Sequence, residues 1–461
     1  MRKYKILIVI VSMFCFSAFA QNKTNKENII FIIVDDLRDL VMAENQLEIL
    51  TPNIDKLRKR GVEFENSFTN YPVCGASRAS ILTGLRPTKS RFRNYDTQIN
   101  KDAPNSLTIA SYLKKNGYRT ISNGKISHYA EDASYGWDDM FRSSRNNPKD
   151  YQDPLNIKNL KNNFGPASEF VYADDNDYSD GKVTQKTIQD IQSINKNDKP
   201  YFIAVGFQKP HLPFIAPKKY WDLYDRNDIS LPLNNFYPPS APKRANYFYE
   251  LRKFSDIPEK GPITEGKAKE LIHAYYACVS YIDAQIGLIL AELDNQGLND
   301  NTTVVLTSDH GFSLSEHGRW SKHNLFQYEL KIPMIISSPK YKKNKTSESF
   351  VELVDLYPTF CDIAGLEIPD FVQGKSLVDN LKNPKKITSD IAFSIWQNGE
   401  TLISNKYYYT EWSRKGSVMR RMLYDIENDE LQMNNIAEIK TNKPIVDSLS
   451  RILNKHIKST N

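Results

Sequence analysis

Hydrophobic residues occur along this chain in short runs that alternate with longer amphipathic stretches. Residues 28–34 read Asn-Ile-Ile-Phe-Ile-Ile-Val, which is apolar on both faces and rich in β-branched side chains. Such a run predicts a strand buried on both sides. Similar runs at 118–122, 201–207, 302–307 and 332–336 predict further strands of the same kind. Strands buried on both faces are typical of a parallel sheet that helices cover.

The stretches between these runs predict helices. Residues 51–61 begin with Thr and Pro and end with Gly, which is the usual order of N-cap, first helical position and C-terminal residue. Residues 106–117 and about 266–293 also have helical spacing. The alternation predicts an α/β fold with a mixed, mostly parallel sheet sandwiched by helices. The Asn-, Asp- and Tyr-rich residues 148–180 are expected to form a long surface loop.

The pattern changes after about residue 365. Three runs have the character of antiparallel meander strands and a helical stretch follows them, at 391–396, 400–412, 419–426 and 444–456. We therefore expect a large domain over 21–365 and a small antiparallel α+β subdomain over 366–461.

The N-terminus has the three parts of a secretory signal. Arg2, Lys3 and Lys5 precede a short apolar run at 6–14, and residues 18–20 read Ala-Phe-Ala. This order predicts a signal peptide over residues 1–20 and a periplasmic or secreted protein. The apolar run is shorter than the roughly 20 residues of a spanning helix, so no membrane anchor is expected.

Composition and charge narrow the class of protein. The 461 residues are 40% hydrophobic and 25% charged, which is typical of a globular protein rather than a disordered one. Three of the residues that give the net charge of +6 belong to the signal, and the chain has no long basic run. No nucleic-acid partner is therefore expected. Four cysteines are too few for a disulfide scaffold. Cys15 lies in the signal, and Cys278 and Cys361 are expected in the core, with a disulfide between them left open.

Polar residues follow three of the predicted strands. Asp35 and Asp36 come after the first strand, Asp309 and His310 after 302–307, and residues 208–211 after 201–207. In open α/β sheets the site lies at the carboxyl ends of the strands. Three carboxylates favour a hard cation such as Ca²⁺, for which an imidazole is an unusual ligand. The sequence thus predicts a divalent metal site at this edge.

One motif carries a family resemblance. Residues 74–78 read Cys-Gly-Ala-Ser-Arg and are followed by Leu-Thr-Gly at 82–84. This segment resembles the maturation motif of type I sulfatases, in which the cysteine is oxidised to formylglycine. The resemblance spans about residues 28–380, including Lys-Pro-His-Leu-Pro-Phe at 209–214 and Asp-His-Gly at 309–311. With Asp-Asp-Leu-Arg at 35–38, it is strongest to the iduronate-2-sulfatase branch and implies an alkaline-phosphatase-like fold.

The resemblance also implies roles for individual residues. A hydrated aldehyde made from Cys74 attacks the sulfur atom and then ejects sulfate. By the same resemblance, Ca²⁺ is held by an oxygen of the modified Cys74 and by Asp35, Asp36, Asp309 and His310. The resemblance further implies that Lys125 and Lys322 bind the sulfuryl group and that Arg78 holds the diol and the metal ligands. It implies His211 as the general acid and His128 as the residue that assists the elimination. The implied partners are a formylglycine-generating enzyme and a sulfated glycan. For His317 and His323, lining the pocket and a structural role remain equal alternatives.

The expected activity is hydrolysis of sulfate esters, at a 2-O position, on sugars of a polysaccharide such as ulvan, carrageenan or a glycosaminoglycan. An alternative is a phosphatase or phosphodiesterase of the alkaline phosphatase superfamily. Those enzymes usually carry Ser or Thr as nucleophile and two Zn²⁺ with an Asp-x-x-x-His pair, and no histidine here has Asp four positions before it. A glycan-binding protein without activity is the non-enzymatic alternative. Four side chains on the loops are expected to meet an anionic sugar: Arg91, Arg93, Trp412 and Arg414.

Overall fold

The computed structural model describes residues 26–40, 47–143, 150–160, 164–194, 199–247 and 250–460. The predicted signal peptide at 1–20 lies outside the described residues.

A central sheet of eight strands organises the molecule, in the order β10-β2-β9-β8-β1-β6-β3-β4. Its strands are β1 (Asn28–Val34), β2 (Val62–Phe68), β3 (Arg119–Gly124), β4 (Asp139–Phe141), β6 (Tyr201–Phe207), β8 (Thr302–Ser308), β9 (Met334–Ser337) and β10 (Lys345–Glu352). β9 runs antiparallel to β2 and β8, and the other pairs are parallel. The mixed, mostly parallel sheet expected from the sequence is confirmed.

Strand β1 shows why the apolar runs form this sheet. All seven of its residues are buried. Ile29, Phe31 and Ile33 belong to one hydrophobic core, and Ile30, Ile32 and Val34 belong to a second core on the other face. Burying one such side chain contributes roughly 1.5–3 kcal/mol, so a run that is apolar on both faces is most stable in the centre of a covered sheet.

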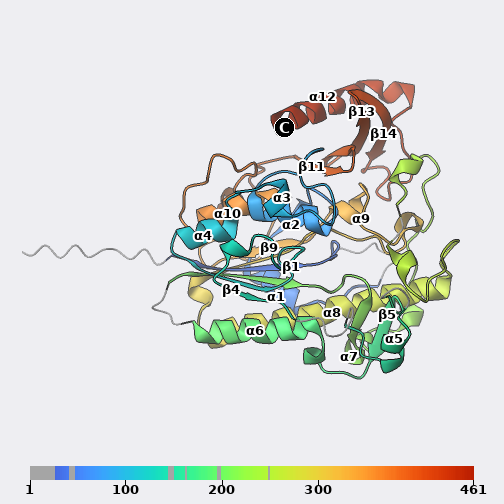
Figure 1. Ribbon diagram of the computed structural model, residues 1–461. Coiled ribbons are helices and arrows are strands. Elements are labelled where there is room, and N and C mark those ends of the chain that lie inside the picture. Colours follow the sequence, from blue (N-terminus) through green and yellow to red (C-terminus); the bar gives the residue numbers. More distant parts are fainter. Residues whose placement is uncertain are drawn as a thin grey trace, which may run out of the picture.

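Helices cover both faces of the sheet (Figure 1). The helices of the described residues are α1 (Pro52–Arg60), α2 (Cys74–Thr83), α3 (Ile99–Asp102), α4 (Ile109–Lys115), α5 (Pro154–Lys158), α6 (Ser179–Ser193), α7 (Lys218–Trp221), α8 (Glu265–Asn295), α9 (Gln327–Leu330), α10 (Leu356–Ile363), α11 (Val378–Lys382) and α12 (Lys443–Thr460). α2, α4 and α10 lie on one face, and α1, α6 and α8 on the other. α8 is long and apolar enough to cross a membrane by composition, but 78% of its most apolar window is buried inside the protein.

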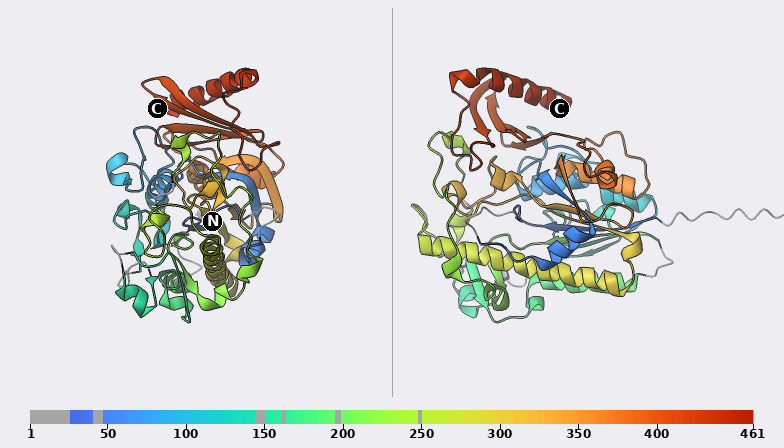
Figure 2. Two further views of the ribbon diagram at one scale, coloured as in Figure 1. Left: turned by 90° about the vertical axis from the view of Figure 1, so that its right-hand side faces the viewer. Right: turned by 180° about the vertical axis from the view of Figure 1, so that it is seen from behind.

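The C-terminal part is a four-stranded antiparallel meander with one helix. Its strands are β11 (Ile391–Trp396), β12 (Gly399–Ser404), β13 (Tyr407–Arg414) and β14 (Ser417–Asp425). α12 packs on the outer face through Val446 and Leu453, whereas Trp396 and Tyr408 on the inner face join the first core of the central sheet. Figure 2 shows this sheet stacked on the same side of the molecule as α2, with α12 outermost.

Two expectations for local structure are wrong in part. Residues 400–412 form two strands rather than one, because the chain turns at Asn405 and Lys406. Residues 148–180 are not one long loop, since they include α5 and a strand, β5 (Ser168–Val171), that pairs in parallel with β7 (Phe214–Pro217). β5 has only four residues, of which Ser168 and Glu169 are polar, so it leaves little hydrophobic signal in the sequence.

The described cysteines, Cys74, Cys278 and Cys361, are all free and buried. Cys278 lies in α8 and Cys361 in α10, in the two cores on opposite faces of the sheet. This arrangement settles the open question of a bridge between them, because the sheet separates the two thiols.

Candidate active site

The site forms where the carboxyl ends of β1 and β8 meet the first turn of α2. Val34 pairs with Ser308 at the ends of the two strands. The residues that follow, Asp35-Asp36 and Asp309-His310, therefore leave the sheet side by side. This placement agrees with the expectation that the polar residues after the strands share one edge.

Four of the five predicted metal ligands gather in one buried group. Asp35, Asp36, Cys74 and His310 each offer a ligand atom, and these atoms lie within 4.8 Å of one another. His310 Nε2 is 3.2 Å from the Cys74 sulfur. Asp309 adjoins the group, with Oδ1 3.7 Å from His310 Nε2, while its Oδ2 accepts a hydrogen bond from Arg78 Nε at 2.8 Å.

Three cations surround these carboxylates. Arg78 donates to Asp35 Oδ1 at 3.1 Å in addition to its bond to Asp309. Lys125 Nζ donates to Asp35 Oδ2. Lys322 Nζ donates to both oxygens of Asp36, at 2.9 and 3.0 Å. The structure thus brings all three predicted cationic residues to the predicted metal ligands.

Helix α2 places Cys74 and Arg78 on the same side, one turn apart. Cys74 is the first residue of the helix, where free backbone N–H groups favour a bound anion. A Cβ atom at Gly75 would lie only 2.1 Å from the carbonyl oxygen of Tyr95, so the 94–95 segment can pack over this turn only beside glycine. Ser77 Oγ donates to the Asp309 carbonyl at 2.6 Å, which ties the helix to the end of β8.

Burial and neighbouring charges shift the ionisation of the group. Although burial opposes ionisation, Lys125 and Arg78 hold the pKa of Asp35 well below its usual value. Burial, together with the charges of Asp35 and Glu250, raises the pKa of Asp36 well above its usual value despite Lys322. Burial and Asp35 likewise raise the pKa of the Cys74 thiol.

The donor set fits a hard divalent cation. Four carboxylates face three cationic side chains, and they are Asp35, Asp36, Glu250 and Asp309 against Arg78, Lys125 and Lys322. A divalent ion would offset the excess negative charge that raises the pKa of Asp36. Carboxylate oxygens dominate the group, and hard cations prefer oxygen ligands.

A cavity of about 550 Å³ opens beside this group and is lined by Asp35, Lys125, His128 and His211 among others. The His128 ring lies between those of Tyr95 and Tyr129, at centroid distances of 6.1 and 4.9 Å. Burial and the nearby Lys125 lower the pKa of His128 to about 3. Both predicted catalytic histidines therefore face the same space as the Asp35 carboxylate.

Glu250 is a site residue that sequence reasoning missed. Its Oε1 is 3.3 Å from Lys322 Nζ and 3.5 Å from His211 Nε2. Glu250 follows no strand and belongs to none of the motifs described above. Only the tertiary fold reveals its place, because its two contacts come from distant parts of the chain.

The two remaining histidines, His317 and His323, each have contacts inside the protein. His317 is fully buried and donates from Nε2 to the carbonyl of Leu431 at 2.8 Å. His323 packs against the rings of Tyr247 and Trp396, at centroid distances of 4.7 and 6.5 Å. Among the described residues that line the cavity, neither histidine is present.

The expectation that Trp412 meets a sugar is wrong. Its side chain is 3% exposed and belongs to the hydrophobic core under the C-terminal sheet. The Arg91 guanidinium donates to the carbonyl of Arg86 at 2.8 Å and to Gln373 Oε1 at 3.1 Å. Arg93 and Arg414 are exposed.

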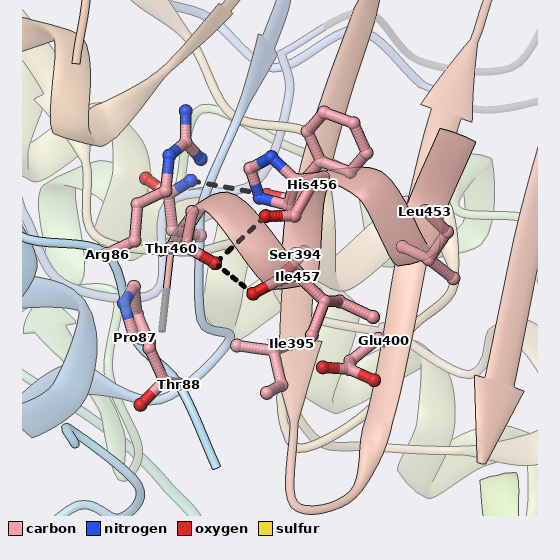
Figure 3. A pocket seen from close by; sticks show the side chains of 12 residues that line it. Arg86, Pro87, Thr88, Ser394, Ile395, Glu400, Leu453, His456, Ile457 and Thr460 are labelled. Atoms are coloured by element: carbon pink, nitrogen blue, oxygen red, sulfur yellow. Dashed lines mark hydrogen bonds between the residues drawn. The ribbon is translucent and has the colours of Figure 1, made fainter. Parts of the chain in front are cut away.

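A second, narrow cavity lies where α12 meets the large part of the molecule (Figure 3). Arg86, Ser394, His456 and Thr460 are among its lining residues. A wider hollow of about 480 Å³ adjoins it and shares Arg86 and His456 with it. Among the described residues that line either space, none is a predicted catalytic or metal-binding residue.

Comparison with known proteins gives two family matches. Residues 27–366 match the family described as Sulfatase, and residues 315–459 match the family described as N-sulphoglucosamine sulphohydrolase, C-terminal. The chain is 32% identical over 410 residues to iduronate 2-sulfatase of Mus musculus, covering 78% of this chain and 73% of that one.

Solved structures share the fold. One of them is the structure of a protein in complex with its substrate, D-glucosamine-2-N,6-O-disulfate. Its TM-score is 0.77 and its sequence identity is 22%, and the match covers 94% of this chain and 98% of that one. A phosphonate monoester hydrolase from Silicibacter pomeroyi has a TM-score of 0.78 and 21% identity, covering 95% of this chain and 96% of that one. At these identities the likeness shows the fold, which is alkaline-phosphatase-like as expected.

Proposed function

We propose, on the premise that the chain belongs to the sulfatase family, that it removes 2-O-sulfate groups from sugars of a sulfated glycan. The chain is a sulfuric ester hydrolase. The observation that carries the proposal is the position of Cys74, at the first turn of α2 within a buried group of acidic ligands and cations. The 2-O position is inferred from the similarity to iduronate 2-sulfatase.

Two groups would complete this site. Formylglycine made from Cys74 would supply, as its hydrate, the oxygen nucleophile that attacks sulfur. A divalent cation, for which we propose Ca²⁺, would be held by Asp35, Asp36, Asp309, His310 and residue 74 and would supply positive charge toward sulfate oxygens.

The cationic side chains bind the reacting group. Lys125 pairs with Asp35 and Lys322 pairs with Asp36, so both ammonium groups lie at the group of carboxylates and can bind a sulfate there. Arg78 spans Asp35 and Asp309 and holds both carboxylates in place through its forked donors. Because all three are buried, water screens their charges weakly.

The histidines transfer protons. His211 borders the cavity and protonates the oxygen that leaves with the sugar. His128 stays neutral because burial and Lys125 lower its pKa to about 3, so it can accept a proton from residue 74 during release of sulfate.

A decisive test uses defined oligosaccharides sulfated at a single position, with sulfate release located by NMR. We expect faster release from 2-O-sulfated sugars than from 4-O- or 6-O-sulfated ones. Matched phosphate esters test the phosphatase alternative. We include this alternative because a phosphonate monoester hydrolase has the same fold. Faster phosphate release with stoichiometric zinc would overturn the proposal.

Maturation and export belong to the same proposal. The signal at residues 1–20 supports a periplasmic or secreted enzyme without a membrane anchor. A formylglycine-generating enzyme would oxidise Cys74 before folding buries the thiol. An intact mass of the active protein that shows an unmodified Cys74 would contradict this maturation.

A further inference from the structure

The His211 ring is fixed in one orientation by the backbone. Its Nδ1 lies 2.6 Å from the carbonyl oxygen of Leu212. A carbonyl can only accept, so Nδ1 carries a proton and the neutral ring presents a bare Nε2. A histidine held in this way acts as an acid only after Nε2 has gained a second proton.

Most of the surroundings oppose that second proton. Burial, then the charge of Lys322, lower the pKa of His211 well below its usual value, and Lys125 adds to this effect. Two carboxylates, Asp35 and Glu250, favour the charged ring. Asp35 is already bound by Arg78 and Lys125, so its charge is largely compensated.

Glu250 is the carboxylate that reaches the ring itself. Its Oε1 lies 3.5 Å from His211 Nε2 and 3.3 Å from Lys322 Nζ. The same carboxylate oxygen thus contacts Lys322 and the His211 ring, which would repel each other once the ring is protonated. Glu250 also faces His323 and is held ionised, because Lys322 and His211 outweigh the effect of burial on its pKa.

We propose that Glu250 is a positioning residue that keeps the acid proton on Nε2 of His211, an inference that rests on the proposed sulfatase function. During cleavage the Nε2–H proton passes to the bridging oxygen as the sulfur–oxygen bond breaks, and that oxygen keeps the bonding electron pair. His211 is left neutral with its Nδ1–H still on Leu212, and water restores the proton on Nε2.

The test compares two leaving groups in Glu250→Gln. A sugar alkoxide needs protonation, whereas 4-nitrophenolate leaves without it. General acid catalysis contributes roughly 10²–10⁴-fold, so kcat/KM for the 2-O-sulfated sugar should fall by about 10²-fold. For 4-nitrophenyl sulfate we expect a change of less than about 5-fold, since no acid is required.

The pH profile gives a second readout. Without the negative charge of Glu250, His211 loses its acid proton at lower pH. The alkaline limb of kcat/KM for the sugar sulfate should therefore move to lower pH in Glu250→Gln. Glu250→Asp keeps the charge and should restore much of the rate, which also separates this effect from misfolding.

Three further variants make the inference falsifiable. His211→Asn should show the same dependence on the leaving group, and the double variant should be little worse than His211→Asn alone because both act on one proton. Glu352→Gln removes a buried, paired carboxylate that lines the wider hollow and should leave the ratio of the two substrates unchanged. Equal losses on both substrates in Glu250→Gln, or additive losses in the double variant, would overturn the role of Glu250. A wild-type enzyme that hydrolyses neither sulfate ester would instead overturn the proposed function.

Discussion

Two buried charge clusters in this molecule look alike in composition but differ in how their oxygens are used. The border cluster consists of Arg86, Glu352, Asp355 and His456, which line the wider hollow. Glu352 Oε1 accepts from Arg86 at 2.7 Å, from Asn70 at 2.9 Å and from the Phe393 amide at 2.9 Å. The two oxygens of Asp355 accept from the amides of Lys375 and Glu352, each at 2.8 Å.

The site cluster consists of Asp35, Asp36, Cys74 and His310, and its possible ligand atoms converge on one point. Asp36 meets Lys322, but its ligand atom also lies within 4.8 Å of those of Asp35, Cys74 and His310. Converging acidic groups raise one another's pKa, as they do for Asp36, unless a cation lies between them. In the border cluster, burial and then the charge of Glu352 raise the pKa of Asp355 to about 7 as well. The two clusters therefore differ in geometry: the oxygens of Glu352 and Asp355 accept from separate amides and side chains, whereas the ligand atoms of the site converge on one point.

The largest expected effect that tests this comparison is the loss of activity when Cys74 is replaced. We expect Cys74→Ala to lower kcat/KM for sulfate esters by on the order of 10⁵–10⁶, because removing a nucleophile costs about that much. Cys278→Ala is the matched control, since it removes a buried thiol from the core on the other side of the sheet. Steady-state rates on one sulfated sugar measure both variants. Full activity in Cys74→Ala would show that the site cluster is structural too.

Arg86→Met tests the border cluster. The change leaves the Glu352 carboxylate buried without its guanidinium partner. Removing one partner of a buried ion pair costs about 3–5 kcal/mol, so we expect a loss of that size in the free energy of unfolding. Urea denaturation measures it, and kcat per folded molecule should stay unchanged. A large fall in kcat with normal stability would mean that the border cluster takes part in catalysis.

For the site cluster we expect the opposite result from Lys125→Met, which is a loss of kcat. Lys125 faces the cavity and its charge is available to the sulfuryl group. Removing one preorganised electrostatic contact typically lowers kcat by about 10²–10³. Lys89→Met is the control, because Lys89 pairs with Glu400 in the C-terminal sheet. Stopped assays on the same sugar sulfate compare the two variants, and equal rates would contradict the clamp.

The sequence predicted the site far better than it predicted the contacts that support it. Asp35 and Asp309 could be located because each follows an apolar run, and residues at strand ends share one edge of a parallel sheet. Cys74 could be located from a motif within one helix turn. Glu250 could not, because its contacts to Lys322 and His211 depend on a loop whose path no periodicity specifies.

The same difference holds for the fold. The long apolar strand β1 was predicted with its observed bounds, since seven consecutive buried residues give an unambiguous pattern. β5 was missed and Trp412 was placed on a binding surface, although it packs in the core under the C-terminal sheet. Aromatic residues are common both in cores and at sugar-binding surfaces. Only packing tells the two apart.

The smallest effect concerns the pH dependence of stability at the border cluster. Burial and the charge of Arg86 lower the pKa of His456 from 6.5 to about 4. Between these values the unfolded chain binds a proton that the folded chain does not, so this histidine destabilises the fold as the pH falls. We expect wild type to lose about 1.5 kcal/mol more than His456→Gln between pH 6.5 and 5. Urea denaturation at both pH values measures the difference. Parallel losses would show that His456 is not held neutral in the folded protein.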